Sequence, residues 1–142
     1  MDDKVLWIGN SEDDASPVIR ISIAASNAKV REFEAIIDTG FTGFLSIPQR
    51  EADRLGLVPI STQIVVFADN SEHVRLIANA TVIMGNESQD GTVFLEPFSD
   101  EVLLGMEFIR SFDRMMLLYP TEGFVQFVGQ SAARSLISTF RP

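Results

Sequence analysis

The chain has 142 residues, the size of one domain, and such a domain buries about two thirds of the surface that its unfolded chain exposes. Its formal net charge of −9 argues against nucleic acid or an anionic membrane surface as a partner, because phosphate groups would be repelled. The sequence has no cysteine and one histidine, His73, which excludes disulfides, thiolate metal sites and a histidine-rich metal cluster within one chain. We therefore expect neither a metal nor another cofactor.

The cytoplasm is the expected location. The N-terminal residues Met1 to Lys4 lack the basic region and the long apolar core of a secretory signal. The longest uncharged apolar stretches are far shorter than a membrane span, so we expect a soluble chain. The acidic run from Glu12 to Asp14 is typical of a solvated linker, which separates residues 1–16 from the core domain.

The core domain begins with the pattern of a strand hairpin followed by a short helix. Apolar residues alternate in residues 18–23 and 30–36, and this period of two predicts paired strands. The second strand leads directly to Asp38. Pro48 stands at a favourable helix start and Gly56 at a favourable helix end, which predicts a helix between them.

Three further strand pairs are predicted, namely residues 64–67 with 74–77, residues 80–84 with 91–95, and residues 114–119 with 123–128. The first pair is joined by a turn and the second by a polar loop at residues 85–90. A strand ending at Leu104 precedes a predicted helix at residues 106–111. Many short strands imply an all-β fold that is closed or nearly closed, with one or two short helices. Residues 129–142 are expected to be a frayed tail or part of a partner-facing surface.

The most informative motif is Asp38-Thr39-Gly40, which presents a carboxylate at the end of an apolar strand. The triplet alone is weak, since Asp followed by Gly is also typical of an ordinary turn. A second element strengthens it. Residues 102–109 read as an apolar strand that breaks at Gly105 and passes into an amphipathic stretch.

These two elements, together with residues 66–71 between them, resemble in their order the small retropepsin-like aspartic proteases of prokaryotes. The resemblance covers residues 17–128, which we interpret as the protease domain, with residues 1–16 as an N-terminal segment and linker and residues 129–142 as a C-terminal tail. It implies a single-lobed acid protease fold, a closed β-barrel with a flap hairpin at residues 65–74, that works as a two-fold dimer.

The number of carboxylates leads to the same dimer. Two aspartates that share one proton can act together as acid and base on a water molecule, whereas a single one cannot. The chain has one such triplet and is too short for two lobes. We therefore expect a homodimer with its two-fold axis at Asp38. Its expected reaction is the cleavage of peptide bonds in extended, apolar segments of polypeptide substrates.

Gly40 would let backbone N–H groups approach the carboxylates, and by resemblance Thr39 would hydrogen-bond across the dimer axis. The predicted substrate-binding residues are apolar pocket walls and flap-turn residues, each apolar one being equally compatible with the core: Phe41, Phe44, Val66, Phe67, Ala68, Asp69, Leu103 and Met106. The alternative function is a non-catalytic peptide-binding or dimerisation module in which Asp38 is only a turn residue.

Overall fold

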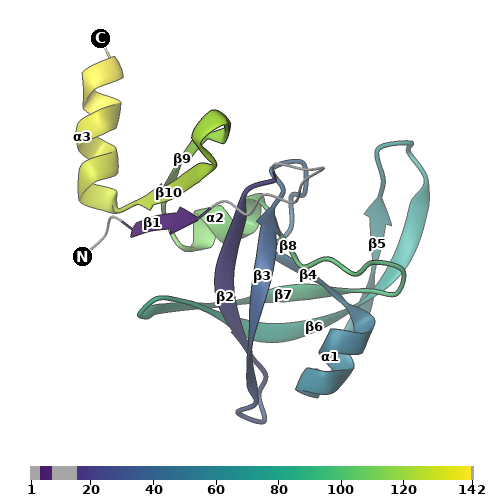
Figure 1. The fold of residues 1–142 in the computed structure, drawn as a ribbon. Helices are drawn as coiled ribbons and strands as arrows, with labels where there is room; N and C mark the ends of the chain where they lie inside the picture. Colours follow the sequence, from purple (N-terminus) through teal and green to yellow (C-terminus); the bar gives the residue numbers. More distant parts are fainter. Residues whose placement is uncertain (1–3, 8–15, 142) are drawn as a thin grey trace.

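The structure is a computed structural model that describes residues 4–7 and 16–141 (Figure 1). Its strands are β1 Lys4–Trp7, β2 Val18–Ala24, β3 Val30–Ile37, β4 Leu45–Pro48, β5 Ser61–Val66, β6 Glu72–Met84, β7 Glu87–Glu96, β8 Leu103–Leu104, β9 Met115–Tyr119 and β10 Phe124–Val128. Its helices are α1 Gln49–Leu55, α2 Met106–Ser111, α3 Gln130–Phe140 and the short 3₁₀ helix η1 Pro120–Glu122. The expectation of a mostly β domain is confirmed, but three α-helices form where we expected one or two.

Seven strands form the larger sheet in the order β2-β3-β8-β4-β7-β6-β5, and β2 also pairs with the far part of β6. The pairs β3–β8 and β4–β7 are parallel, and the other pairs are antiparallel. Alternate residues point into the core because successive side chains of a strand face opposite sides. In β2 these are Ile19, Ile21 and Ile23, all fully buried.

The predicted first hairpin and first helix are confirmed. Strands β2 and β3 pair from Val18–Ile36 to Ala24–Val30. Helix α1 begins directly after Pro48 and ends at Gly56, which has a left-handed backbone (φ 74°). A glycine adopts this conformation without steric cost, which explains why the helix stops there.

The predicted polar loop at residues 85–90 is wrong. Only Gly85 and Asn86 form the turn, since Met84 already pairs with Glu87 and β7 continues to Glu96. The residues from Glu87 to Asp90 are exposed. These β7 residues pair with residues 81–84 of β6, whose Val82 and Met84 are buried, but they are all polar themselves, so the apolar alternation on which we relied is missing from this part of β7.

A second, three-stranded sheet has the order β1-β10-β9 (Figure 1). The predicted pairing of β9 and β10 across residues 120–122 is confirmed. Strand β1, from the segment that we placed before the core domain, pairs with β10. Phe127 of β10 meets Phe108 of α2 edge-on at 6.4 Å between ring centroids, which joins this sheet to the core.

Within the described part of the chain, no helix has the length and apolar character needed to cross a membrane.

Candidate active site

The Asp38 carboxylate lies where β3 ends, and backbone hydrogen bonds fix that end. The Asp38 N–H donates to the Leu104 carbonyl at 2.9 Å, and the Ile36 N–H donates to the Val102 carbonyl at 2.8 Å. Residues 36 and 37 also pair in parallel with β8. The strand that carries the aspartate is therefore held by the same segment that the sequence singled out as the second motif.

The triplet itself folds as a tight turn around the carboxylate. The Gly40 N–H donates to Asp38 Oδ1 at 2.9 Å, and the Phe41 N–H donates to the Asp38 carbonyl at 3.1 Å. A Cβ atom on Gly40 would lie 3.2 Å from Oδ1, closer than an ordinary contact. Asp38 is half-buried, whereas Thr39 and Gly40 are exposed. Glycine at position 40 therefore permits the close approach of a backbone donor to the carboxylate, as the sequence predicted.

The loop that follows the triplet is bound to the start of α2. The Met106 N–H donates to the Phe41 carbonyl at 2.8 Å, and the Glu107 N–H donates to the Gly43 carbonyl at 3.1 Å. A Cβ atom on Gly105 would lie 2.2 Å from the Gly43 carbonyl oxygen and 2.5 Å from that of Phe41. No side chain fits there, so Gly105 is needed for this contact. Sequence reasoning noticed the glycine as a strand breaker but missed this role.

The structure divides the predicted pocket walls into two groups. Phe44 is 3% exposed and packs on Phe108 in the core, at 5.9 Å between ring centroids. Phe41 and Leu103 are half-buried, and Met106 is 42% exposed beside the loop. These three residues lie on the segments that are hydrogen-bonded around Asp38.

A cavity of about 340 Å³ lies next to this loop. Its lining combines the loop, strand β5, strand β7 and helix α2, with Thr42, Gly43, Phe44, Gln63, Phe94 and Glu107 among its residues. Phe94 also meets the ring of Phe41 edge-on at 5.8 Å. Sequence reasoning missed Gln63 and Phe94, because only the folded sheet brings β5 and β7 to the loop. It also missed Glu107 as a lining residue, although Glu107 lies in the second motif.

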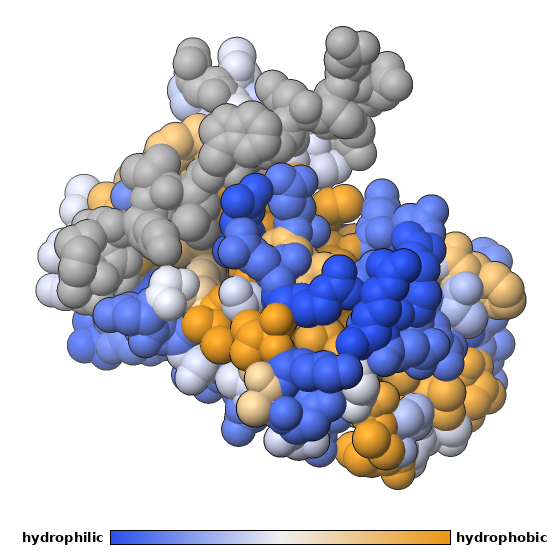
Figure 2. All heavy atoms as spheres, turned by 60° about the horizontal axis from the view of Figure 1, so that its bottom comes forward, coloured by the Kyte–Doolittle hydropathy of each residue, from blue (hydrophilic) through white to orange (hydrophobic). Residues whose placement is uncertain are grey.

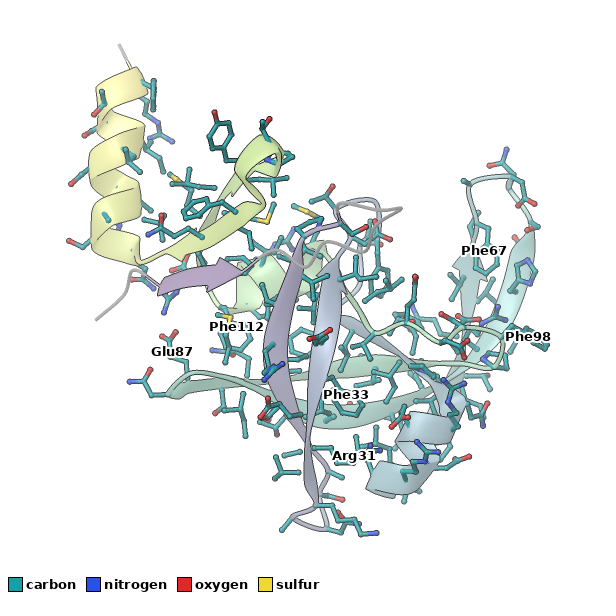
Figure 3. All side chains as sticks on the ribbon, in the orientation of Figure 1. Arg31, Phe33, Phe67, Glu87, Phe98 and Phe112 are labelled. Atoms are coloured by element: carbon teal, nitrogen blue, oxygen red, sulfur yellow. The ribbon has the colours of Figure 1, made fainter. Side chains whose placement is uncertain are left out.

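The predicted flap is the hairpin of β5 and β6, whose turn projects away from the larger sheet (Figure 1). Phe67, labelled in Figure 3, lies at its turn. Its ring stacks on His73 at 4.1 Å, and the guanidinium of Arg75 lies 5.4 Å from its centroid. Arg75 is 8% exposed and pairs with Glu96 at 2.9 to 3.0 Å. Phe67, a predicted substrate-binding residue, thus packs against His73 and Arg75 on one side of the hairpin.

Polar side chains close the tip of this turn. The Ser71 hydroxyl donates to Asp69 Oδ1 at 2.5 Å, and the Ser71 backbone N–H donates to the same oxygen at 2.9 Å. These two hydrogen bonds, the hydroxyl one first, hold the pKa of the Asp69 carboxyl below its usual range. Asp69 therefore has a structural partner within the turn, and Ala68 beside it is exposed.

The opposite face of the hairpin is apolar and exposed. Ile64 pairs with Val74, so their side chains share one face with Val66 and Leu76. Of these four exposed residues, only Val66 was among the predicted substrate-binding residues. The signal for the others was available in the alternation of both strands, but it could be read only with the pairing register.

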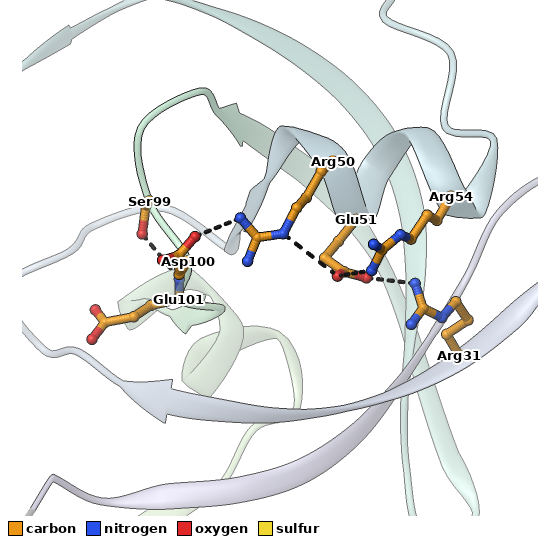
Figure 4. A network of polar contacts seen from close by, with 7 residues as sticks. All are labelled: Arg31, Arg50, Glu51, Arg54, Ser99, Asp100 and Glu101. Atoms are coloured by element: carbon orange, nitrogen blue, oxygen red, sulfur yellow. Dashed lines mark hydrogen bonds and ion pairs between the residues drawn. The ribbon is translucent and has the colours of Figure 1, made fainter.

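A network of charged side chains fastens α1 to the neighbouring segments (Figure 4). Glu51 accepts from Arg31 of β3 at 2.5 Å, and Arg50 donates to Asp100 at 2.5 Å. Asp100 lies in the connection between β7 and β8, two residues before Val102. Figure 2 shows a broad hydrophilic area bordered by apolar patches on the face that it brings forward. The network joins three segments that lead to the site, although such exposed pairs contribute little stability each.

In the described ranges, no group of three or more His, Asp or Glu side chains is arranged to hold a metal ion.

The chain has no matching protein-family profile and no matching curated protein by sequence. Its fold is similar to the crystal structure of a retropepsin-like aspartic protease from Rickettsia conorii, with a TM-score of 0.57 and 15% identity over 89% of this chain and 91% of that one. It is also similar to the protease of simian foamy virus (mac), with a TM-score of 0.45 and 16% identity over 64% of this chain and 91% of that one. The similarity to the Rickettsia conorii protease shows that the chain has the retropepsin-like fold that its motifs predicted.

Proposed function

We propose that the chain is a homodimeric aspartic endopeptidase in which two copies of Asp38, one from each subunit, activate a water molecule. The observation that carries this proposal is the Asp38 carboxylate at the fixed end of β3, with a backbone N–H donating to Oδ1 at 2.9 Å. An ordinary surface turn does not need a strand end held by a second strand and a helix start. The retropepsin-like fold adds support.

The reaction needs the second carboxylate because the two aspartates have different tasks. Two carboxyl groups about 3 Å apart do not both ionise, because their like charges repel, so one member of the pair keeps a proton and the other stays charged. The charged carboxylate accepts a proton from the attacking water, and the protonated one donates to the carbonyl oxygen of the peptide bond. The proton that was taken up then passes to the leaving amine as the C–N bond breaks.

In this proposal the substrate is an extended polypeptide that lies between the Asp38 loop and the hairpin of β5 and β6. An extended peptide can pair with strand backbone while its side chains enter alternate pockets. Phe41, Leu103 and Met106 would form the apolar walls near Asp38, with Phe44 behind them in the core. Thr39 would hydrogen-bond to the partner subunit's loop, and its exposure is compatible with this role.

The alternative is a peptide-binding or dimerisation module without catalysis. The experiment compares wild type with Asp38→Asn on a diverse peptide pool between about pH 3.5 and 7, the range of a pair that shares one proton. New termini are identified by mass spectrometry. Asp53→Asn is the matched control, because Asp53 is an exposed residue of α1 and the chemical change is the same.

We expect cleavage by wild type and Asp53→Asn, and its loss in Asp38→Asn with the dimer retained. Equal cleavage by all three proteins would refute the role of Asp38. A folded wild-type dimer that binds peptides but leaves them intact would favour the binding module.

A further inference from the structure

Arg75 of β6 is a buried cation in the hairpin of β5 and β6. It is 8% exposed, and a charged side chain is rarely buried so far unless it is paired. Its Nε donates to both carboxylate oxygens of Glu96 on β7 at 3.0 Å, and its Nη1 donates to the Val74 carbonyl at 3.1 Å. The Glu96 side chain is itself only 20% exposed. A charged pair out of water therefore fixes the guanidinium of Arg75 to the neighbouring strand.

The same guanidinium holds the flap turn. It lies over the ring of Phe67, 5.4 Å from the centroid, and that ring stacks on His73 at 4.1 Å. A cation is attracted to the face of an aromatic ring, and more strongly where water is excluded. At the far end of the stack, His73 Nε2 lies 2.8 Å from the Ser71 hydroxyl. A continuous chain of contacts therefore runs from β7 to the tip of the turn.

The stack lies on the same face of the hairpin as the cavity next to the Asp38 loop. Residues paired directly across two strands share a face of the sheet, and so do residues two apart on one strand. Gln63 pairs with Arg75, and Phe94 lies two residues before Glu96. Gln63 and Phe94 both line that cavity. The face of the hairpin that carries Arg75 is therefore the one turned toward the Asp38 loop.

We infer that Arg75 is a positioning residue for the proposed reaction: held by Glu96, it fixes Phe67 on the cavity side of the flap turn, where the Phe67 ring contacts the substrate. This inference rests on the proposed function. Phe67 is 39% exposed, so part of its ring is open to a ligand while one face is stacked. A turn that is ordered before the substrate arrives loses less entropy on binding. The contribution of Arg75 is therefore to substrate affinity rather than to the chemical step.

Stability alone does not account for the pair of Arg75 and Glu96. Buried ion pairs add little net stability, because the loss of hydration offsets the attraction, and apolar side chains of similar volume often stabilise a protein at least as well. The planar fork of arginine instead fixes direction as well as distance, which a lysine ammonium does not. This geometry suits a side chain that holds an aromatic ring in one place.

The test is Arg75→Lys, with Glu96→Gln as a second variant and Arg114→Lys as the matched control. Lysine keeps the charge but loses the fork and the planar contact with Phe67. Arg114 is buried to a similar degree, with a side chain 7% exposed, and it pairs with Glu87. Glu87 and Phe67 lie on opposite sides of the molecule in Figure 3. The control therefore makes the same chemical change far from the flap.

Two measurements separate positioning from stability. His73 is the only histidine of the chain, so its ring protons give NMR signals of their own. The stacked ring of Phe67 shifts these signals upfield, and the variant Phe67→Leu shows by how much. The second measurement is kcat and KM for a peptide that wild type cleaves, at a temperature where circular dichroism shows every variant folded.

We expect Arg75→Lys and Glu96→Gln to move the His73 signals toward those of Phe67→Leu. We also expect them to raise KM at least about fivefold with kcat within about twofold of wild type, while Arg114→Lys changes neither quantity. Unmoved His73 signals in both flap variants would overturn the role of Arg75 in holding Phe67.

Moved signals with an unchanged KM would overturn the contact between Phe67 and the substrate. Either of these results leaves the proposed function intact while cleavage depends on Asp38. If wild type binds peptides without cleaving them, the proposed function is wrong, and the dissociation constant decides the inference in place of KM. Wild type that neither binds nor cleaves peptides would overturn both.

Discussion

Substitution of Gly105 by alanine tests the way in which the Asp38 loop is held. The new Cβ atom would lie 2.2 Å from the Gly43 carbonyl oxygen and 2.5 Å from that of Phe41, so the loop and the start of α2 must separate by about 1 Å. The separation breaks the hydrogen bonds from the Met106 and Glu107 N–H groups to these carbonyls.

The magnitude follows from these contacts. Two backbone hydrogen bonds contribute about 1 kcal/mol each, and the forced shift in a packed region costs about 1–3 kcal/mol. We therefore expect the free energy of unfolding to fall by about 3–5 kcal/mol. At roughly 3 °C per kcal/mol for a domain of this size, the melting temperature should fall by about 10 °C or more.

Thermal unfolding by circular dichroism measures this change, and peptide cleavage is assayed well below the lower melting temperature. Cleavage should be lost together with stability, because the displaced loop carries Asp38. A melting temperature within about 3 °C of wild type would refute the reasoning, since the steric conflict would then have been relieved without cost.

Gly40→Ala should impair cleavage without a comparable loss of stability. Its Cβ atom meets only Asp38 Oδ1 at 3.2 Å, so we expect little change in melting temperature but a loss of cleavage of about tenfold or more. Unchanged kcat/KM would show that the carboxylate tolerates the displacement. The flap turn should loosen in acid. Because the pKa of Asp69 is lowered, the stability that its ionised carboxylate contributes is present at neutral pH and is lost as pH falls through the folded-state pKa, which lies below the ordinary value of 3.8. An NMR titration of the Ser71 amide should report that midpoint, and a midpoint at or above 3.8 would contradict the hydrogen-bond assignment.

Much of the site could be predicted from the sequence because its signals are local. A carboxylate after an alternating strand, followed by glycine, indicates a strand-end turn, and the turn forms around Asp38 with Gly40 as donor. Helix limits at Pro48 and Gly56 also depend on single residues, whose backbone preferences act without tertiary contacts. The same holds for the hairpin of β2 and β3, whose period of two is visible in one segment.

Tertiary structure decided what depends on pairs of distant segments. The stretch of β7 from Glu87 to Asp90 contains no apolar residue, so nothing local distinguishes it from a loop. The steric need for Gly105 exists only because the Asp38 loop, more than sixty residues earlier, lies against it. Likewise, the apolar residues of α3 are periodic in sequence, but only the fold buries Ala133 and leaves Phe140 81% exposed. The sequence by itself determined the turn chemistry of Asp38, whereas the position of that turn among strand, helix and flap required long-range packing, which no single segment encodes.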